Sequence, residues 1–372
     1  MPRSGDWLLF HGGALGDLAL TVQLALRLSG VHGGSGLLVV SRTGLGRLSG
    51  CRPSVRRICP EGLGLHRLYM EGDQVLPERL RELVAGQRVL NALGAEDSLV
   101  HRRLLALGAE AVYSFDPRPQ PGRRAHITLQ WQGQLGRQGL SFSRDGGATS
   151  VPTALDVPDE LRSAGYDLLE QAWLARGGGE EADGETGRRP DRRWLSRRPW
   201  HAAVLVHPGS GGRAKCWPLA GFLEVARRLR RRGVPVVFLI GPVEVERWTT
   251  AEIGAVRDGF PLIEAPSPDE LVKLLAAAGM LLSNDAGPAH LASLLGTPTV
   301  TLFGPTAASV WRPLGERAHA VSGDPRRGWD WGIRPEQVVE VIASGCRCET
   351  PLPRGEGPGE GGDSPRRAGV SA

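Results

Sequence analysis

The chain has 372 residues, 41% hydrophobic and 23% charged, a composition that favours a soluble protein of two domains and argues against wholesale disorder. No apolar stretch approaches the roughly 18 residues of a membrane-spanning helix. Near the N-terminus, Asp17 and its neighbouring glycines interrupt the apolar pattern, so we expect no signal peptide. A cytoplasmic enzyme is the class that remains.

The net charge of +5 does not by itself indicate nucleic-acid binding. Only Lys215 and Lys273 among the 45 basic residues are lysines, and the arginines are scattered without interleaved aromatic residues, so we expect no nucleic-acid partner. The densest run, residues 227–232, lies on a predicted helix. Its plain interpretation is a solvated outer face, and weak attraction to anionic lipid is the alternative.

The five cysteines do not have the spacing of a zinc site. An odd number of cysteines in a chain without a signal peptide favours reduced thiols with a structural role. We therefore expect no metal site.

The first half of the chain alternates between strand and helix patterns, which is typical of βαβ units. The expected strands are Trp7–His11, Leu37–Val40, Arg88–Asn91 and Ala111–Phe115, and the expected helices are about Leu15–Leu28, Glu78–Ala85 and Ser98–Leu107. Residues 41–75 give no clear pattern.

Residues 176–200 are polar, charged and rich in glycine, which predicts a linker or a disordered insertion. The second half then predicts a parallel sheet wrapped by helices. Its expected strands are Ala203–His207, Val234–Ile240, Met280–Ser283 and Thr299–Phe303, and its expected helices are about Leu219–Arg232, Asp269–Ala278, His290–Leu295 and Pro335–Ala343. Residues 350–372 are expected to form a disordered tail.

A first candidate loop, HGGALGD (residues 11–17), joins a strand to a helix. Its glycines let backbone amides approach a ligand, and the start of a helix favours negative charge. The spacing does not match the G-x-G-x-x-G fingerprint of dinucleotide sites. Asp17 is either a first-turn carboxylate that satisfies free amides or a general base at the carboxyl end of the sheet.

A second loop, HPGSGGRAKCWP (residues 207–218), also lies between a strand and a helix. Ser210 adds a hydroxyl group and Lys215 a point charge suited to phosphate oxygens. Without the G-K-[ST] of a P-loop, an NTPase is disfavoured. A flexible loop with a surface lysine is the plain alternative.

A third loop, SNDAGPAH (residues 283–290), ends a strand and starts a helix. Asp285 and His290 would stand beside the amides of Ala286 and Gly287, which builds a site for an anion or a sugar hydroxyl. The alternative is an ordinary helix cap followed by a buried histidine.

Together these loops resemble glycosyltransferase family 9, the heptosyltransferases of bacterial lipopolysaccharide core synthesis. The matching stretches are LLFHGGALGDLALT, LVHPGSGGRAKCWPLAGFLEVARRL and LLSNDAGPAHLASLLGTPTVTLFGPT. The resemblance implies an α/β fold of GT-B architecture, with two Rossmann-like domains whose parallel sheets face each other across a cleft.

The resemblance also implies a division of the chain. Residues 1–175 would form the N-terminal acceptor-binding domain, and residues 201–330 the C-terminal domain that binds a nucleotide sugar. Residues 331–349 would contain a helix that crosses back to the first domain.

By the same resemblance, Asp17 is the catalytic base, and Lys215 lies near the donor's phosphates and assists catalysis. Gly13 and Gly16 lie in the loop on the acceptor side. Glu244 contacts the nucleotide ribose, and Glu246 is the alternative residue for this role. The remaining donor-binding residues would be Ser210, Gly211, Asp285, Ala286, Gly287 and His290.

The implied activity is inverting transfer of a sugar, heptose from ADP-heptose, to a lipopolysaccharide core or another cell-surface glycan. No cofactor is expected beyond the donor substrate. A lipid-linked acceptor would bring the enzyme to the cytoplasmic face of the inner membrane, through a peripheral contact. Two alternatives remain open: a nucleotide-sugar epimerase on the same fold, and a non-catalytic sugar-binding relative.

Overall fold

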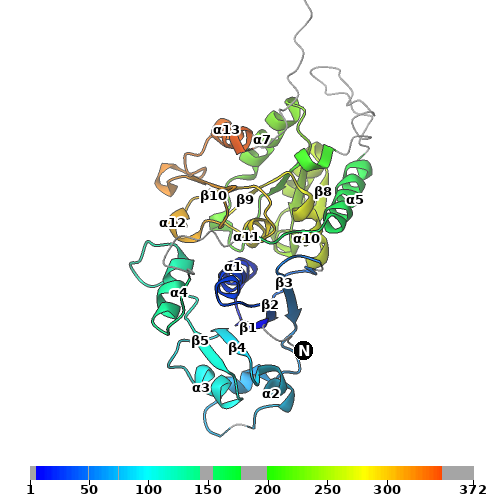
Figure 1. Ribbon diagram of the computed structural model, residues 1–372. Coiled ribbons are helices and arrows are strands. Elements are labelled where there is room, and N and C mark those ends of the chain that lie inside the picture. The colour runs from blue at the N-terminus through cyan, green and yellow to red at the C-terminus, as the bar shows by residue number, and fades with distance from the viewer. Residues whose placement is uncertain (1–5, 49, 74, 143–153, 177–198, 346–372) are drawn as a thin grey trace, which may run out of the picture.

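The computed structural model describes residues 6–48, 50–73, 75–142, 154–176 and 199–345, which form two parallel sheets, each covered by helices (Figure 1). Most of the predicted linker and the whole predicted tail lie outside these residues. Among the described residues, no helix combines the length and the apolar character needed to cross a bilayer.

The first sheet has the strand order β3-β2-β1-β4-β5, and all its neighbouring strands are parallel. Strands β1 and β2 are buried along their whole length, as expected for central parallel strands covered on both faces. The strands are β1 (Asp6–His11), β2 (Gly36–Ser41), β3 (Ser54–Ile58), β4 (Arg88–Ala92) and β5 (Ala111–Ser114), and the helices are α1 (Leu15–Val31), α2 (Glu78–Val84), α3 (Leu99–Ala106) and α4 (Ile127–Gly136).

The second sheet has the order β11-β10-β9-β6-β7-β8 and is also parallel throughout. Its strands are β6 (Val204–His207), β7 (Val236–Ile240), β8 (Leu262–Glu264), β9 (Met280–Asn284), β10 (Thr299–Phe303) and β11 (Ala318–Ser322). Its helices are α7 (Leu219–Arg231), α8 (Pro242–Arg247), α9 (Thr250–Gly259), α10 (Pro268–Ala277), α11 (Gly287–Leu294), α12 (Ala308–Trp311) and α13 (Pro335–Gly345).

The two sheets meet where α1 packs on α11, in the middle of the molecule (Figure 1). Glycines make this contact close. A Cβ on Gly16 would lie 2.9 Å from Cδ2 of His290, and a Cβ on Gly287 would lie 2.8 Å from Cβ of Leu15. One buried apolar cluster runs through both helices, so the two halves share a core.

Helix α5 (Asp159–Ala175) falls within the stretch that the sequence assigns to the first domain, yet it packs against α10 of the second sheet. Gly165 allows this contact, since a Cβ there would lie 2.0 Å from the carbonyl oxygen of Lys273. Arg162 also donates to the carbonyl oxygen of Ala276, at 2.9 Å. The chain thus reaches the second half of the molecule before residue 176.

Helix α13 differs from its sequence prediction. Instead of crossing back to the first domain, it packs on α7 and on β10 and β11 of the second (Figure 1). Its buried residues Val338, Val339 and Ile342 complete the apolar cluster on that face of the sheet. Arg228 of α7 bridges to Glu336 at 2.6 Å, which fixes the start of α13 on its neighbour.

Candidate active site

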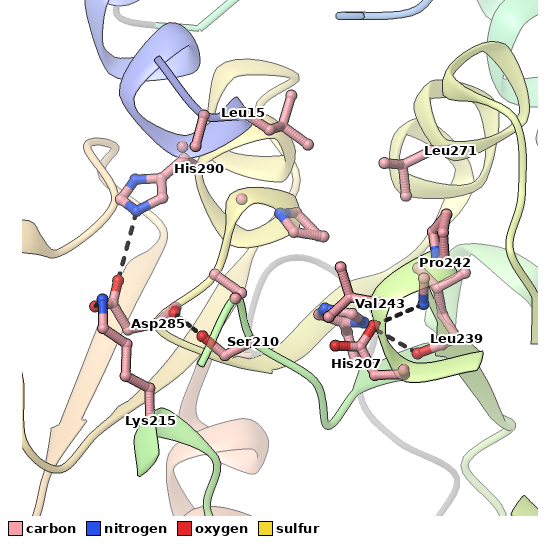
Figure 2. A pocket seen from close by; sticks show the side chains of 18 of the residues that line it. Leu15, His207, Ser210, Lys215, Leu239, Pro242, Val243, Leu271, Asp285 and His290 are labelled. Atoms are coloured by element: carbon pink, nitrogen blue, oxygen red, sulfur yellow. Dashed lines mark hydrogen bonds and ion pairs between the residues drawn. The ribbon is translucent and has the colours of Figure 1, made fainter. Parts of the chain in front are cut away.

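A cavity of about 560 Å³ lies where the two halves meet (Figure 2). Its wall combines the start of α1 with the loops that follow β6, β7 and β9. The chain leaves β6 toward β7 on one side and returns to β9 on the other. The cavity therefore lies at the switch point of the second sheet, where open α/β sheets bind ligands. All three predicted loops contribute to it; the lining residues include Ala14, Gly16, Asp17, Ser210, Gly211, Lys215, Glu244, Asp285, Ala286, Gly287 and His290.

Asp17 stands in the first turn of α1 and lines the cavity from the first domain. Burial raises the pKa of its carboxyl group, while His290, a backbone hydrogen bond at Ala14 and Lys215 partly oppose the rise. A carboxylate held above its ordinary pKa is a stronger base than an exposed one, which suits the removal of a proton from a hydroxyl group.

Asp285 is the centre of a charged cluster on the opposite wall (Figure 2). Its Oδ2 accepts from Thr306 Oγ1 at 2.8 Å and lies 3.9 Å from Lys215 Nζ. Its Oδ1 lies 3.7 Å from His290 Nε2. Burial acts to raise the pKa of Asp285, but hydrogen bonds with His290 and Thr306 outweigh it, and the pKa is lowered. Asp285 is thus an anion at neutral pH that faces the ammonium group of Lys215.

Ser210 and Gly211 join this cluster in different ways. The Ser210 hydroxyl donates to the carbonyl oxygen of Asp285 at 2.8 Å, so it ties the second loop to the third. Gly211 has open space where a Cβ would lie, which leaves its backbone accessible from the cavity. The two helix starts at Leu15 and Gly287 carry no side-chain cap, so their first amides remain suited to an anionic ligand.

Glu244 and Glu246 are separated by the structure. Glu244 is buried and lines the cavity, and its Oε2 accepts from the Gly241 amide at 2.9 Å. Glu246 is exposed on α8 and does not belong to the cavity wall. A glycine at position 209 leaves room for the Glu244 carboxylate, because a Cβ on Gly209 would lie 2.2 Å from Cδ of Glu244.

The wall near Glu244 is apolar and lies apart from the charged cluster, as Figure 2 shows around Leu239, Pro242 and Val243. His207 below it is buried, and burial lowers its pKa, although Glu244 acts in the opposite direction. The cavity therefore has a charged end, suited to phosphates, and an apolar end, suited to a flat ring.

Gly13 and Gly16, the two glycines predicted on the acceptor side, have different surroundings. Gly16 lines the cavity and gives His290 its room. Gly13 lies outside the cavity wall, and a Cβ there would stand 2.9 Å from Cε1 of His11 and 3.2 Å from Oδ2 of Asp17.

Sequence reasoning missed several lining and supporting residues. Thr306 lies within the GPT end of the third matching stretch, and that position could have drawn attention to it. Trp311, Leu271 and Pro266 also line the cavity, but each belongs to a segment without a recognisable motif.

Within the described ranges, no three histidine, cysteine or acidic side chains gather closely enough to hold a metal ion. Three of the five cysteines lie within the described ranges, and all three are free thiols: Cys51, Cys59 and Cys216.

Comparison with known proteins shows which family this chain resembles. Residues 186–330 match Glycosyltransferase family 9 (heptosyltransferase). The resemblance to glycosyltransferase family 9 is confirmed. Lipopolysaccharide heptosyltransferase 3 of Escherichia coli is 32% identical over 113 residues, which cover 30% of this chain and 33% of the relative. The chain spans about a third of the length of the curated relatives it matches.

Solved structures of heptosyltransferases are similar to this chain over the whole fold. The ADP-heptose lipopolysaccharide heptosyltransferase II of E. coli has a TM-score of 0.62 at 16% identity, over 91% of this chain and 98% of that one. The E. coli heptosyltransferase WaaC with ADP has a TM-score of 0.57 at 16% identity, over 91% and 99% of the two chains. These likenesses confirm the GT-B fold.

Proposed function

We propose that this chain is an inverting glycosyltransferase that moves heptose from ADP-heptose to a lipopolysaccharide core or a related cell-surface glycan. The observation that carries the proposal is the cavity between the two halves. Asp17, a carboxylate of raised pKa, lines it from one half, and Lys215, Asp285 and His290 line it from the other.

The names of the relatives support the choice of substrates. The first curated relatives are lipopolysaccharide heptosyltransferases, and one structural neighbour was solved with ADP. The two ends of the cavity suit such a donor: the apolar wall at Pro242 and Val243 fits a base, and the cluster around Asp285 and Lys215 fits a diphosphate and its sugar.

In the proposed reaction Asp17 takes the proton of the acceptor hydroxyl while the hydroxyl oxygen attacks the anomeric carbon of the donor. The bond from that carbon to the diphosphate breaks on the opposite face, and ADP leaves with the electron pair. Lys215 and the amides at the start of α11 stabilise the negative charge that grows on the diphosphate. Substrates bound in the cavity between the halves would displace water that would otherwise hydrolyse the donor.

The decisive experiment incubates the protein with ADP-heptose and a heptose-deficient lipopolysaccharide core oligosaccharide. We expect a new glycosidic bond of inverted anomeric configuration by NMR. Asp17→Asn should slow transfer at least about a hundredfold and leave the affinity for ADP, measured by calorimetry, unchanged. Asp167→Asn, on an exposed position of α5 outside the cavity, is the matched control and should transfer normally.

Other outcomes would replace the proposal. Full activity of Asp17→Asn would remove this residue from the mechanism. Interconversion of the nucleotide sugar without an acceptor would favour the epimerase, and failure to bind any nucleotide at millimolar concentration would favour a non-catalytic relative.

A further inference from the structure

The wall of the candidate active site follows the strand order of the second sheet. Lining residues come after five neighbouring strands, in the order β10-β9-β6-β7-β8: Trp311, Asp285, Ser210, Val243 and Leu271. Because these strands are parallel, the segments that follow them lie in the same order along one edge of the sheet. Figure 1 shows α12, which carries Trp311, and β8 at opposite sides of this sheet. Trp311 therefore stands at the end of the cavity opposite Leu271.

This order also indicates where each part of a bound donor would lie. The apolar wall at Val243 and Leu271 suits the base, and the cluster of Lys215 and Asp285 suits the diphosphate. A nucleotide sugar laid along this edge has its base at β7 and β8 and its diphosphate at β6 and β9. The transferred sugar then lies beyond the diphosphate, on the β10 side, where Trp311 lines the cavity.

The segment that carries Trp311 is tied to the first half of the molecule by two hydrogen bonds. His126 Nε2 donates to the carbonyl oxygen of Arg312 at 2.8 Å, and Gln23 Nε2 donates to the carbonyl oxygen of Leu314 at 3.2 Å. Gln23 belongs to α1, the helix whose first turn contains Asp17. The indole of Trp311 therefore lines the cavity beside the place where the two halves are joined.

The indole of Trp311 is available to a ligand. It is half-buried, because it packs against the apolar cluster that the two halves share and also lines the cavity. Trp131 and Trp217 donate their indole N–H groups to the carbonyl oxygens of Pro117 and Asp330. The N–H of Trp311 donates no hydrogen bond to any residue that the structure describes. Such a ring can pack on the C–H face of a sugar and donate to one of its hydroxyl groups.

We propose that Trp311 is a specificity-determining residue whose indole packs against the transferred sugar of the donor. The inference rests on the proposed function, because it takes the donor to be ADP-heptose. The sugar is the part of this donor that ADP lacks. The indole therefore contributes to the binding of ADP-heptose and contributes nothing to the binding of ADP.

The test is calorimetric titration of the full chain with ADP-heptose, in the absence of an acceptor, and separately with ADP. We expect Trp311→Ala to weaken the binding of ADP-heptose about tenfold, which corresponds to ~1.4 kcal/mol, and to leave the affinity for ADP unchanged. Trp311→Phe keeps an aromatic face and should retain most of the affinity for ADP-heptose. Trp329→Ala is the matched control: it removes an indole that is 73% exposed and lies outside the cavity wall, and it should bind both nucleotides as the wild type does.

Two results would overturn the proposal. An equal loss of affinity for ADP and ADP-heptose in Trp311→Ala would mean that the indole supports the base wall or the fold. Unchanged binding of ADP-heptose would mean that the sugar does not touch the indole, and a raised KM for the acceptor alone would then assign Trp311 to the acceptor. Failure of the proposed function gives different results. Binding of ADP-heptose that depends on Trp311, without any sugar transfer, would support the contact and refute the transferase, whereas no binding of ADP-heptose by the wild type would refute both.

Discussion

At the scale of single residues, the raised pKa of Asp17 has two measurable consequences. Because burial is its main cause, the acidic limb of the pH profile of kcat/KM should lie above the ordinary aspartate value of 3.8. The folded chain also binds this proton more tightly than the unfolded chain does, so ionised Asp17 lowers stability as pH rises through this range.

Asp17→Asn removes that cost. We expect its melting temperature at pH 7 to be no lower than that of the wild type, with the difference shrinking as the pH falls toward 3.8. A clear loss of stability at pH 7 would contradict the role of burial and point to a structural cap.

At the scale of elements, the glycines between α1 and α11 set the distance between the two walls of the site. A Cβ on Gly287 would lie 2.8 Å from Cβ of Leu15, an atom close to the backbone, so Gly287→Ala has to push the helices apart. We expect a loss of about 1–3 kcal/mol in the free energy of unfolding and a lower kcat, since Asp17 moves away from the donor.

Gly254→Ala is the matched control for that change. Gly254 lies inside α9, with nothing within 4 Å of its built Cβ. Alanine there should keep full activity and add up to about 1 kcal/mol of stability, as urea unfolding would measure. Equal stability of the two variants would mean that α1 and α11 adapt without cost.

The elements that the sequence predicts are those with regular apolar patterns, such as α1, β7 and β9. Helix α4 was missed because its sequence mixes apolar and polar residues: Ile127, Trp131 and Leu135 are buried together with Thr128 and Gln130. Gln130 and Gln134 accept from the backbone amides of Gln120 and Asp116. Strand β3 was missed because its arginines, Arg56 and Arg57, hide the strand pattern. Neither the backbone partners of these glutamines nor the pairing of β3 with β2 can be identified from the sequence alone, because the fold brings them together.

At the scale of the whole molecule, the three loops that line the candidate site were predicted from sequence, but the contacts between the two halves were not. His126, the residue before α4, shows why. Its Nε2 donates to the carbonyl oxygen of Arg312, at 2.8 Å, and its Nδ1 accepts at the first turn of α4 from Thr128. These partners are 186 and 2 residues away, and no local pattern reveals the distant one.

His126 therefore has two roles: it caps α4, and it connects the first half of the molecule to the second. Two substitutions separate these roles. Asparagine caps helices well, so His126→Asn should keep the start of α4 and lose only the bond to Arg312, at a cost of about 1 kcal/mol. His126→Ala should lose both. In hydrogen exchange, His126→Asn should accelerate residues 308–314 alone, whereas His126→Ala should also accelerate residues 127–136.

The pH dependence of stability gives a second test of the contact between His126 and Arg312. Burial, the largest cause, lowers the pKa of His126 below 6.5, so the unfolded chain binds a proton at this residue more tightly than the folded chain does. The wild type therefore loses stability as the pH falls below 6.5, and His126→Asn lacks this contribution. The free energy of unfolding that His126→Asn loses relative to the wild type, measured in urea, should become smaller as the pH falls from 7.5 to 5.5. A difference in stability that stays constant over this range would show that His126 has the same pKa in the folded and unfolded chain. The contact between the halves would then not disfavour its protonation.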